Sequence, residues 1–254
     1  MSEGRRFEGK VLLATGGGSG IAAATAMQWA EEGGRVAVLD LNGAGAEKVA
    51  AELDGSIGLG VDVADEEGLR EAIAKAKRHF GSIDGALCAA GHARFGPIES
   101  WSLDDWEMMM RVHAGGTFLT CRELVPIMRG QGGGSIVNVA SVAAFVAQPQ
   151  NAVYGAAKGA IVSFSRQIAR ELAPSIRVNV VAPGRILTPM TEAVWTARGG
   201  GDFEKAASAA ATANMQRRVA KAAEVAGPVC FLLSAEASFV TGSVVHPDGG
   251  EIVI

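Results

Sequence analysis

Short hydrophobic runs alternate with longer segments of helical pattern along most of the chain. The runs suit strands that are buried on both faces of a parallel sheet, and they fall at 11–14, 35–39, 58–61, 85–90, 134–140, 177–182 and 243–246. Helices are expected after the first run to about residue 32, and at 66–80, 103–128, 154–172 and 224–233. This alternation predicts an α/β fold: a single domain over 1–254 that forms a doubly wound parallel sheet with helices on both faces.

One stretch, 188–221, does not continue this rhythm. It is rich in glycine and alanine. Long irregular segments inside compact domains are commonly functional, for example as active-site lids. We therefore expect 188–221 to be a mobile substrate lid within the single domain.

The first hydrophobic run leads into a glycine-rich turn at 15–22, T-G-G-G-S-G-I-A, and the second run ends in Asp40. Glycines allow a tight turn and let backbone N–H groups approach a pyrophosphate, which the following helix N-terminus stabilises. An acid about twenty residues beyond the glycines accepts hydrogen bonds from ribose hydroxyls and repels a 2′-phosphate. No basic residue follows at Leu41 or Asn42, so the pattern favours NAD over NADP. The alternative for Asp40 is a solvated residue at a strand end.

Tyr154 is the single tyrosine in the sequence, and Lys158 follows it by four residues. On a helix these two side chains project from one face. A phenol ionises near pH 10, and a nearby ammonium lowers its pKa; reaching about 7 takes roughly 4 kcal/mol of differential stabilisation. A phenol tuned in this way can act as a general acid/base, while the hydroxyl of Ser141 holds a substrate oxygen. Taken alone, a Y-x-x-x-K spacing is common by chance and is better explained by two surface residues on an Ala-rich helix; the glycine-rich turn and the strands around it favour the chemical interpretation instead.

Composition and charge exclude several other functions. The net charge of -4 argues against nucleic acid as a partner. The hydrophobic runs stay short of the roughly 18 residues that span a bilayer, and residues 1–10 are too polar for a signal peptide. We therefore expect a cytoplasmic protein that has no membrane partner. Cys88, Cys121 and Cys230 lie in hydrophobic segments without metal-ligand spacing, which predicts buried reduced thiols and no metal site.

With these residues placed, the chain resembles the short-chain dehydrogenase/reductase family from about residue 10 to 250. The turn at 15–22 is similar to the family's T-G-x-x-x-G-I-G cofactor turn, and Ser141, Tyr154 and Lys158 match its catalytic serine and Y-x-x-x-K motif. The resemblance implies a Rossmann-like fold and a set of residues that contact the cofactor. These are Gly16, Gly18, Ser19, Gly20, Ile21, Asp40, Leu41, Asp62, Val63, Ala89, Ala90, Gly91, Tyr154, Lys158, Pro183, Gly184, Ile186 and Thr188.

The resemblance also implies a mechanism. Tyr154, as a phenolate, would take the alcohol proton; Lys158 would lower its pKa and bind the nicotinamide ribose, and Ser141 would hydrogen-bond the substrate oxygen. Two departures from the family pattern are mild. Ala22 replaces the third glycine of the turn, which related fingerprints accept. The sequence C-A-A-G at 88–91 replaces the family's N-N-A-G.

The third departure is His113, which stands where the family has a catalytic asparagine in its long helix. In the family, the backbone carbonyl at this position holds a water in the proton relay. Three roles are open for His113: the backbone role alone, an imidazole of near-neutral pKa that joins the relay, or a buried histidine without a catalytic part. The neighbouring Gly115-Gly116 would help the helix to open there.

The predicted substrate wall is mostly hydrophobic, which suits a small or medium secondary alcohol or its ketone. Arg94 has two interpretations, a partner for an anionic substrate or a solvated loop charge. We assign eleven residues to this wall by position, which are Ser141, Ala143, Phe145, Gln148, Tyr154, His92, Arg94, Phe95 and the lid residues Met190, Trp195 and Met215. The family resemblance implies a D2 homotetramer, with a dimer as the alternative.

The function predicted from the sequence is hydride transfer between NAD(H) and a secondary alcohol/ketone pair. One alternative is an NADPH-dependent 3-oxoacyl thioester reductase, against which Asp40 and Ser19 speak. The other is a non-catalytic dinucleotide-binding regulatory protein, in which His113 would have disabled the relay. The joint retention of a serine, a tyrosine and a lysine at the catalytic positions argues against this last hypothesis.

Overall fold

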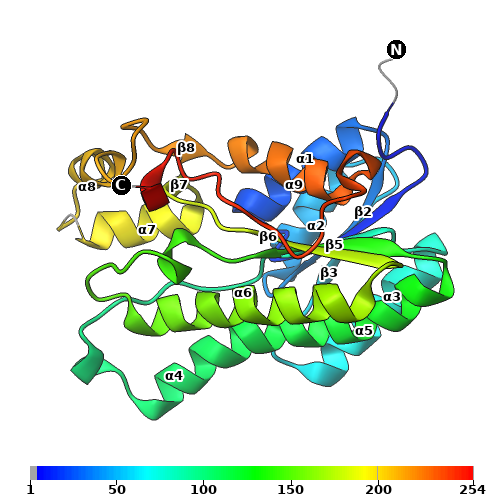
Figure 1. Cartoon of the computed structure of the whole chain (residues 1–254), viewed down its shortest axis with the longest axis horizontal. Coiled ribbons are helices and arrows are strands. Elements are labelled where there is room, and N and C mark those ends of the chain that lie inside the picture. Colours follow the sequence, from blue (N-terminus) through cyan, green and yellow to red (C-terminus); the bar gives the residue numbers. More distant parts are fainter. Residues whose placement is uncertain (1–4, 199, 254) are drawn as a thin grey trace.

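The computed structural model describes residues 5–198 and 200–253, and its centre is a seven-stranded parallel sheet (Figure 1). The strand order is β3-β2-β1-β4-β5-β6-β9, and every neighbouring pair runs parallel. The strands are β1 Val11–Thr15, β2 Arg35–Asp40, β3 Ile57–Gly60, β4 Gly85–Cys88, β5 Gly134–Val139, β6 Ile176–Val181 and β9 Val244–Val245. The predicted doubly wound sheet is therefore confirmed.

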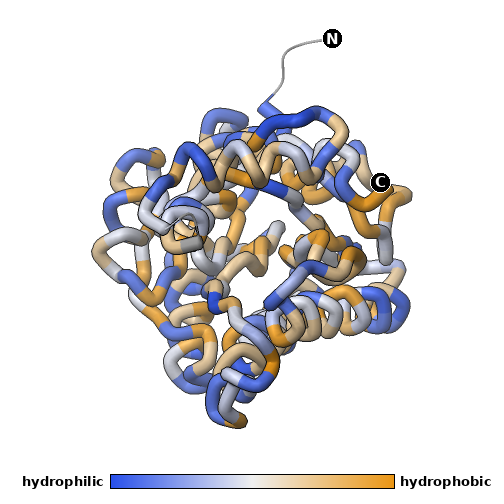
Figure 2. Tube along the Cα trace, turned by 90° about the vertical axis from the view of Figure 1, so that its left-hand side faces the viewer, coloured by the Kyte–Doolittle hydropathy of each residue, from blue (hydrophilic) through white to orange (hydrophobic). Residues whose placement is uncertain are grey.

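Helices cover both faces of this sheet (Figure 1). One face is packed by α1 (Gly20–Glu31), α2 (Gly43–Ala51) and α9 (Ala223–Leu233), and the other by α3 (Glu66–Phe80), α5 (Gly116–Gly130) and α6 (Ala152–Leu172). In β1, Leu12 and Ala14 join the first core while Val11 and Leu13 join the second. This alternation explains why the strand is hydrophobic at every position. Figure 2, turned by 90° from the view of Figure 1, shows coiled segments along which hydrophobic and hydrophilic residues alternate.

The long predicted helix after β4 consists of three parts. The helix α4 (Leu103–Met110) continues through a π-helical turn at Arg111–Gly115 into α5. The sequence suggested a break near Gly115-Gly116. In the structure the helix stays continuous, and one of its turns is the wider π-helical form. Single π-helical turns are frequent at functional sites, and this one contains His113.

Three helices were not expected from the sequence. The helix α2 is short and composed largely of glycine and alanine, so its hydrophobic pattern is weak; its N-cap Asn42 accepts a hydrogen bond from Gly45 N at 3.1 Å. The other two, α7 (Pro189–Arg198) and α8 (Phe203–Ala211), occupy the predicted lid. The two ends of this segment are brought together by a small parallel pair, β7 (Ile186–Leu187) with β8 (Ala220–Lys221).

Candidate active site

The chain order of the strands reverses between β1 and β4, which leaves a crevice at their carboxyl ends. A cavity of about 270 Å³ lies at this edge of the sheet. It brings together residues from the glycine-rich turn, from the ends of β2, β4, β5 and β6, and from α6 and α7. Its lining includes the predicted residues Gly16, Ser19, Gly20, Ile21, Asp40, Ala89, Gly91, His113, Ser141, Tyr154, Lys158, Pro183, Gly184, Ile186, Thr188 and Met190.

The glycine-rich turn has the geometry that a dinucleotide site requires. Gly16 and Gly20 adopt φ values of +68° and +60°, in the left-handed region that favours glycine. A Cβ on Gly16 would lie 2.8 Å from the Cα of Ala90, so the turn is pressed against the end of β4. Ala22, the substituted third glycine, is buried in the core against the sheet. The substitution is therefore accommodated by packing.

Asp40 is held beside this turn by backbone hydrogen bonds. Its carboxylate accepts from Gly18 N at 2.9 Å and from Asn42 N at 2.8 Å. A Cβ on Gly18 would stand only 3.0 Å from the Asp40 carboxylate. The open, glycine-lined cradle next to a fixed carboxylate fits the adenosine ribose and pyrophosphate of a dinucleotide.

Five predicted cofactor residues, Gly18 among them, are not part of the lining of this cavity. Leu41 is exposed; Asp62 accepts a hydrogen bond from Ala64 N at 2.8 Å. Val63 is buried against Gly116 in the long helix, where a Cβ on the glycine would come within 2.7 Å of the valine side chain. Ala90 packs under Gly16. Asp62 and Val63 follow β3, next to the end of β2, and so lie at the same edge of the sheet as Asp40.

Ser141, Tyr154 and Lys158 line one cavity, although they come from two separate segments. Ser141 follows β5 and caps a short 3₁₀ turn, where its hydroxyl accepts from Ala143 N at 3.2 Å. Lys158 is buried on α6, and its Nζ donates to the Val139 carbonyl at 2.9 Å. The Nζ lies 5.6 Å from the centroid of the Tyr154 ring. The predicted i,i+4 pair is therefore on one helix face and points at the end of β5.

The protonation states of this pair differ from the sequence-based expectation. Burial raises the pKa of Tyr154 to about 12. A hydrogen bond with Ser141 lowers this pKa, but its effect is smaller than that of burial. Burial also lowers the pKa of Lys158 to about 7. The expectation that the ammonium lowers the pKa of the phenol is therefore not met in this arrangement. The reason is that the same desolvation disfavours both charged forms, phenolate and ammonium.

His113 is buried at the π-helical turn and is fixed by the chain after β4. Its Nε2 lies 2.9 Å from the carbonyl oxygen of His92 and 3.2 Å from His92 N. A Cβ on Gly91 would come within 2.4 Å of the imidazole, so the ring fills the space that glycine leaves. The ring meets the Tyr154 ring edge-on, with 5.5 Å between centroids.

The electrostatics of His113 argue against one of its three predicted roles. Burial lowers the pKa of the imidazole to about 2, and the charge of Lys158 acts in the same direction. A pKa this low favours a neutral ring at physiological pH over the expected imidazole that titrates near neutrality. The backbone carbonyl of His113 accepts a hydrogen bond from Thr117 Oγ1 at 2.8 Å.

A second, smaller cavity of about 90 Å³ opens next to the first and shares Ser141, Tyr154, Gly184, Met190 and Thr191 with it. It is lined by seven of the eleven residues that the sequence assigned to the substrate wall, which are Phe95, Ser141, Ala143, Gln148, Tyr154, Met190 and Trp195. The sequence missed three polar members, which are Asn151, Arg185 and Thr191. Two of them stand next to motifs that the sequence did identify: Asn151 directly precedes the helix that carries Tyr154, and Arg185 directly follows Pro183-Gly184.

The other predicted wall residues, His92, Arg94, Phe145 and Met215, do not line this cavity. Arg94 forms an ion pair with Asp105, and its guanidinium carbon lies 4.9 Å from the centre of the Trp101 ring. Phe145 packs edge-on against His246, with 4.8 Å between centroids. Met215 is exposed and lies close to Gly250. Of the two interpretations of Arg94, the paired loop charge is the one that the geometry supports.

The structure also bears on membrane insertion and on metal binding. Over residues 5–198 and 200–253, none of the helices combines the length and the hydrophobicity needed to cross a bilayer. The same residues hold no group of three or more histidine, cysteine, aspartate or glutamate side chains arranged to bind a metal ion. Cys88, Cys121 and Cys230 are buried free thiols, as expected.

Comparison with known proteins gives matches over nearly the whole chain. The D-threitol dehydrogenase of Mycolicibacterium smegmatis is 38% identical over 250 residues, which cover 96% of this chain and 94% of that protein. The 3-oxoacyl-(acyl-carrier-protein) reductase of Thermotoga maritima is 36% identical over 253 residues, with 98% and 100% covered.

Solved structures agree with these sequence matches. The crystal structure of levodione reductase superposes with a TM-score of 0.93 at 34% identity, covering 97% of this chain and 99% of that one. An NAD⁺-bound xylitol dehydrogenase gives a TM-score of 0.90 at 33% identity, with 96% and 99% covered. A family model described as enoyl-(acyl carrier protein) reductase matches residues 16–251. The chain therefore belongs to the short-chain dehydrogenase/reductase family of oxidoreductases.

Proposed function

We propose that this protein is an NAD-dependent oxidoreductase that interconverts a secondary alcohol and its ketone. The observation that carries the proposal is the joint placement of Ser141, Tyr154 and Lys158 in one cavity with the glycine-rich turn and Asp40. The relatives support it, because they include proteins named as dehydrogenases of threitol and xylitol and as a reductase of levodione.

In this proposal the cofactor lies along the crevice. The glycine-rich turn would receive the pyrophosphate, and Asp40 would accept the ribose hydroxyls and repel a 2′-phosphate. Pro183, Gly184 and Thr188 would face the nicotinamide, and Lys158 its ribose. Bound NAD⁺ would supply the acceptor for the hydride that leaves the carbinol carbon, so that one alcohol gives one ketone, one NADH and one proton. The NAD⁺-bound relative supports the choice of NAD.

The chain itself would orient the substrate and move its proton. The Ser141 hydroxyl would hold the substrate oxygen next to the Tyr154 hydroxyl. In the reductive direction the neutral phenol, whose pKa is about 12, is the correct form to give a proton to a ketone oxygen. In the oxidative direction Tyr154 must first lose its proton, and a charged Lys158 stabilises the phenolate that results. The neutral imidazole of His113 would act by fixing the loop at His92 and by packing against the Tyr154 ring.

Three broader assignments belong to the same proposal. The segment 188–221 would act as the substrate lid, because Met190, Thr191, Val194 and Trp195 of α7 line the smaller cavity. A homotetramer would bury the exposed hydrophobic side chains of α4 and α5, which are Leu103, Trp106, Met108 and Phe118. The protein would be located in the cytoplasm.

The cofactor assignment is tested by thermal stabilisation with NAD, NADH, NADP and NADPH in parallel, since a ligand that binds the folded state raises the melting temperature. We expect a shift with NAD or NADH and little with the phosphorylated forms. Asp40→Asn removes the charge at nearly constant size, and should weaken the NAD shift and strengthen the NADP shift. The exposed Asp54 offers a matched control, Asp54→Asn, which should leave both shifts unchanged.

A stronger shift of the unmodified protein with NADP(H) would instead favour the 3-oxoacyl reductase alternative. No shift with any of the four would favour the regulatory alternative. Formation of NADH from a secondary alcohol then tests the activity itself.

A further inference from the structure

The smaller cavity has a polar end, which is lined by Gln148, Asn151 and Arg185. The Nδ2 of Asn151 donates to the Gln148 side-chain oxygen at 3.4 Å. Gln148 belongs to the loop between Ser141 and α6, whereas Arg185 directly follows Pro183-Gly184. The two walls at this end therefore come from separate segments of the chain, and the width of the cavity depends on what holds them together.

Glu251 connects these two walls from outside the cavity. Its Oε1 accepts a hydrogen bond from Arg185 Nη2 at 2.8 Å and another from the Gln148 nitrogen at 3.2 Å. Glu251 does not line the cavity, and its side chain is only 4% exposed. One buried carboxylate oxygen thus contacts both walls.

The Arg185–Glu251 ion pair is expensive in terms of stability. Burial raises the pKa of Glu251, and the guanidinium of Arg185 acts against this rise. Glu251 Oε2 and Arg185 Nε are buried and have no hydrogen-bond partner among the described residues. Buried ion pairs are weak contributors to stability, and hydrophobic residues of similar volume commonly replace them without loss. We therefore expect the contribution of this pair to be geometric.

The backbone that carries Glu251 is fixed beside the site. Asp248 accepts hydrogen bonds from Gly250 N and Ile252 N, both at 2.9 Å, which curls the chain after β9 into a tight turn. A Cβ on Gly184 would lie only 2.8 Å from the Cα of Asp248. The turn is consequently packed against the loop that leads to Arg185, and it holds the carboxylate at a defined distance from that loop.

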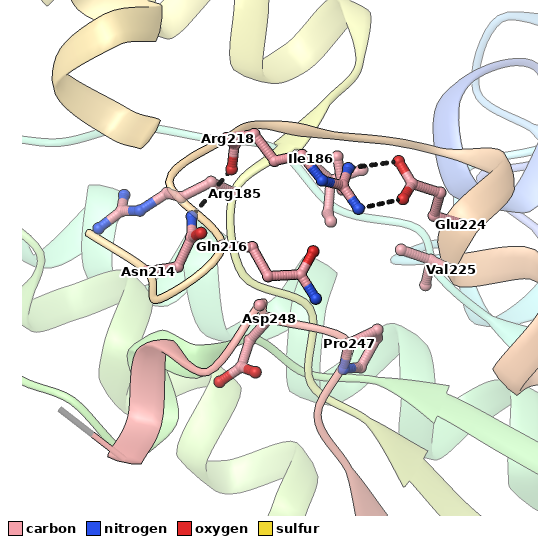
Figure 3. Close-up of a pocket in the computed structure, with 11 residues that line it drawn as sticks. Arg185, Ile186, Asn214, Gln216, Arg218, Glu224, Val225, Pro247 and Asp248 are labelled. Carbon is pink, nitrogen blue, oxygen red and sulfur yellow. Dashed lines mark hydrogen bonds and ion pairs between the residues drawn. The ribbon is translucent and has the colours of Figure 1, made fainter. Parts of the chain in front are cut away.

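The same turn also contacts the end of the lid. Gln216 N donates to the Gly249 carbonyl at 3.2 Å. Figure 3 shows the neighbouring cavity of about 160 Å³ that these residues line, with the Arg185 side chain directed away from the Arg218–Glu224 ion pair. Arg218 nitrogens lie 2.9 Å and 2.6 Å from the two Glu224 oxygens. Glu224 therefore does not compete with Glu251 for Arg185.

We propose that Glu251 is a positioning residue for the substrate, which sets the width of the polar end by holding Arg185 and Gln148 at a fixed separation. This inference rests on the proposed alcohol/ketone activity and adds a residue from outside the catalytic set. Neither Arg185 nor Gln148 lines the larger cavity, in which the cofactor is placed. Loss of the contacts should therefore affect the alcohol and leave the cofactor unaffected.

The first experiment uses Glu251→Gln, which removes the charge at nearly constant size. The probe is whichever of 2-butanol, cyclohexanol and 1-phenylethanol the unmodified protein oxidises with the highest kcat/KM, followed as NADH formation. We expect kcat/KM for this alcohol to fall at least about tenfold, the effect of losing a charge-assisted contact, while KM for NAD stays within about twofold. A general defect of the fold would change both.

A matched control is Glu32→Gln. Glu32 accepts a hydrogen bond from Arg6 at 2.7 Å in a partly buried ion pair, at the end of α1 that lies away from the glycine-rich turn. Its loss should leave kcat/KM for the alcohol and KM for NAD unchanged. An equal effect of Glu32→Gln and Glu251→Gln on the alcohol would overturn the positioning role.

Two more variants test whether Glu251 acts through its partners. Arg185→Met and Gln148→Met are each combined with Glu251→Gln, and kcat/KM of each double variant should lie within about threefold of Glu251→Gln alone, because side chains in one network are not additive. Effects that multiply in full would show that the three side chains act independently, which overturns the proposal.

Glu251→Gln leaves a buried guanidinium without its partner and could fold poorly. The paired replacement of Arg185→Met with Glu251→Leu removes both charges and should melt no lower than the unmodified protein. It should still lose at least about tenfold in kcat/KM for the alcohol, as expected for a geometric role. Full kcat/KM in this folded variant would overturn the proposal.

Amide hydrogen exchange tests the contacts without any alcohol, because exchange reports local opening. In Glu251→Gln the amides of 142–151 and 185–188 should exchange faster, while those of β1 keep their rates. Unchanged exchange in both loops overturns the contacts, whether or not an alcohol is oxidised. Faster exchange with unchanged kcat/KM overturns the positioning role while the activity stands. No NADH from any of the three alcohols overturns the proposed activity and the positioning role together.

Discussion

Replacing His113 by asparagine should change how the stability of the protein depends on pH. The imidazole is buried, with its pKa lowered to about 2, while in the unfolded chain a histidine has a pKa near 6.5. Below pH 6.5 the unfolded state therefore binds a proton that the folded state does not. The stability that the neutral ring permits is fully present above pH 6.5 and is lost as the pH falls toward 2.

The size of this effect follows from the shift. Each pH unit below 6.5 costs about 1.4 kcal/mol of unfolding free energy. At pH 5 the loss is about 2 kcal/mol, a large part of the roughly 5–15 kcal/mol by which domains are stable. Asparagine does not titrate, so His113→Asn should remove this loss. Its effect on stability at pH 7.5 has no fixed sign, because the contacts with His92 and Gly91 change as well.

The measurement is urea unfolding of the unmodified protein and of His113→Asn at pH 7.5, 6.0 and 5.0. The difference in unfolding free energy should move by about 2 kcal/mol in favour of the variant between pH 7.5 and pH 5.0. His246, whose pKa burial also lowers, is present in both proteins, and its contribution cancels. The control His79→Asn alters an exposed ring and should show no such movement. A difference that stays constant with pH would refute the buried neutral state of His113.

Two further substitutions address the catalytic pair. Tyr154→Phe should abolish turnover while leaving the thermal shift with NAD largely intact, because the phenol handles the proton; retained activity would remove Tyr154 as the acid/base. Lys158→Met should abolish turnover and yet stabilise the fold by about 3 kcal/mol at pH 7. The shift of the ammonium pKa from 10.5 to about 7 costs about 4 kcal/mol at that pH, and loss of the hydrogen bond to the Val139 carbonyl offsets about 1 kcal/mol of the gain. That penalty grows as the pH falls from 10.5 toward 7, so urea unfolding should show a smaller gain at pH 10, and an equal gain at both pH values would contradict the assignment.

The sequence by itself determined the core strands, the glycine-rich turn and the placement of the catalytic pair on one helix. A strand buried on both faces must be hydrophobic at successive positions, so the runs at β1 and β5 were readable directly. The i,i+4 spacing placed Tyr154 and Lys158 on one face of α6, because helix geometry is local. The left-handed conformations of Gly16 and Gly20 are likewise local, and the turn was recognisable without the rest of the chain.

Helices that lack a clear hydrophobic pattern could not be predicted from the sequence. The helix α2 packs so closely on β3 that a Cβ on Gly58 would lie 2.4 Å from Glu47 N. Small residues make this approach possible, but they also erase the hydrophobic periodicity by which a helix is predicted. The sequence therefore missed α2, and it missed α7 and α8 of the lid for a similar lack of pattern.

Only the tertiary structure decided the charges and the polar end of the site. The spacing of Tyr154 and Lys158 suggested an ammonium that lowers the pKa of a phenol, but the pKa values follow from burial by β5, the long helix and the chain after β4. The position of His113 was known from the sequence; its neutrality was not. Arg185 pairs with Glu251, Gln148 donates to Glu251, and Asn151 donates to Gln148. These contacts join three separate segments of the chain. No local pattern encodes such a network, because its orientation is fixed by an ion pair that exists only once the C-terminal segment has packed against the domain.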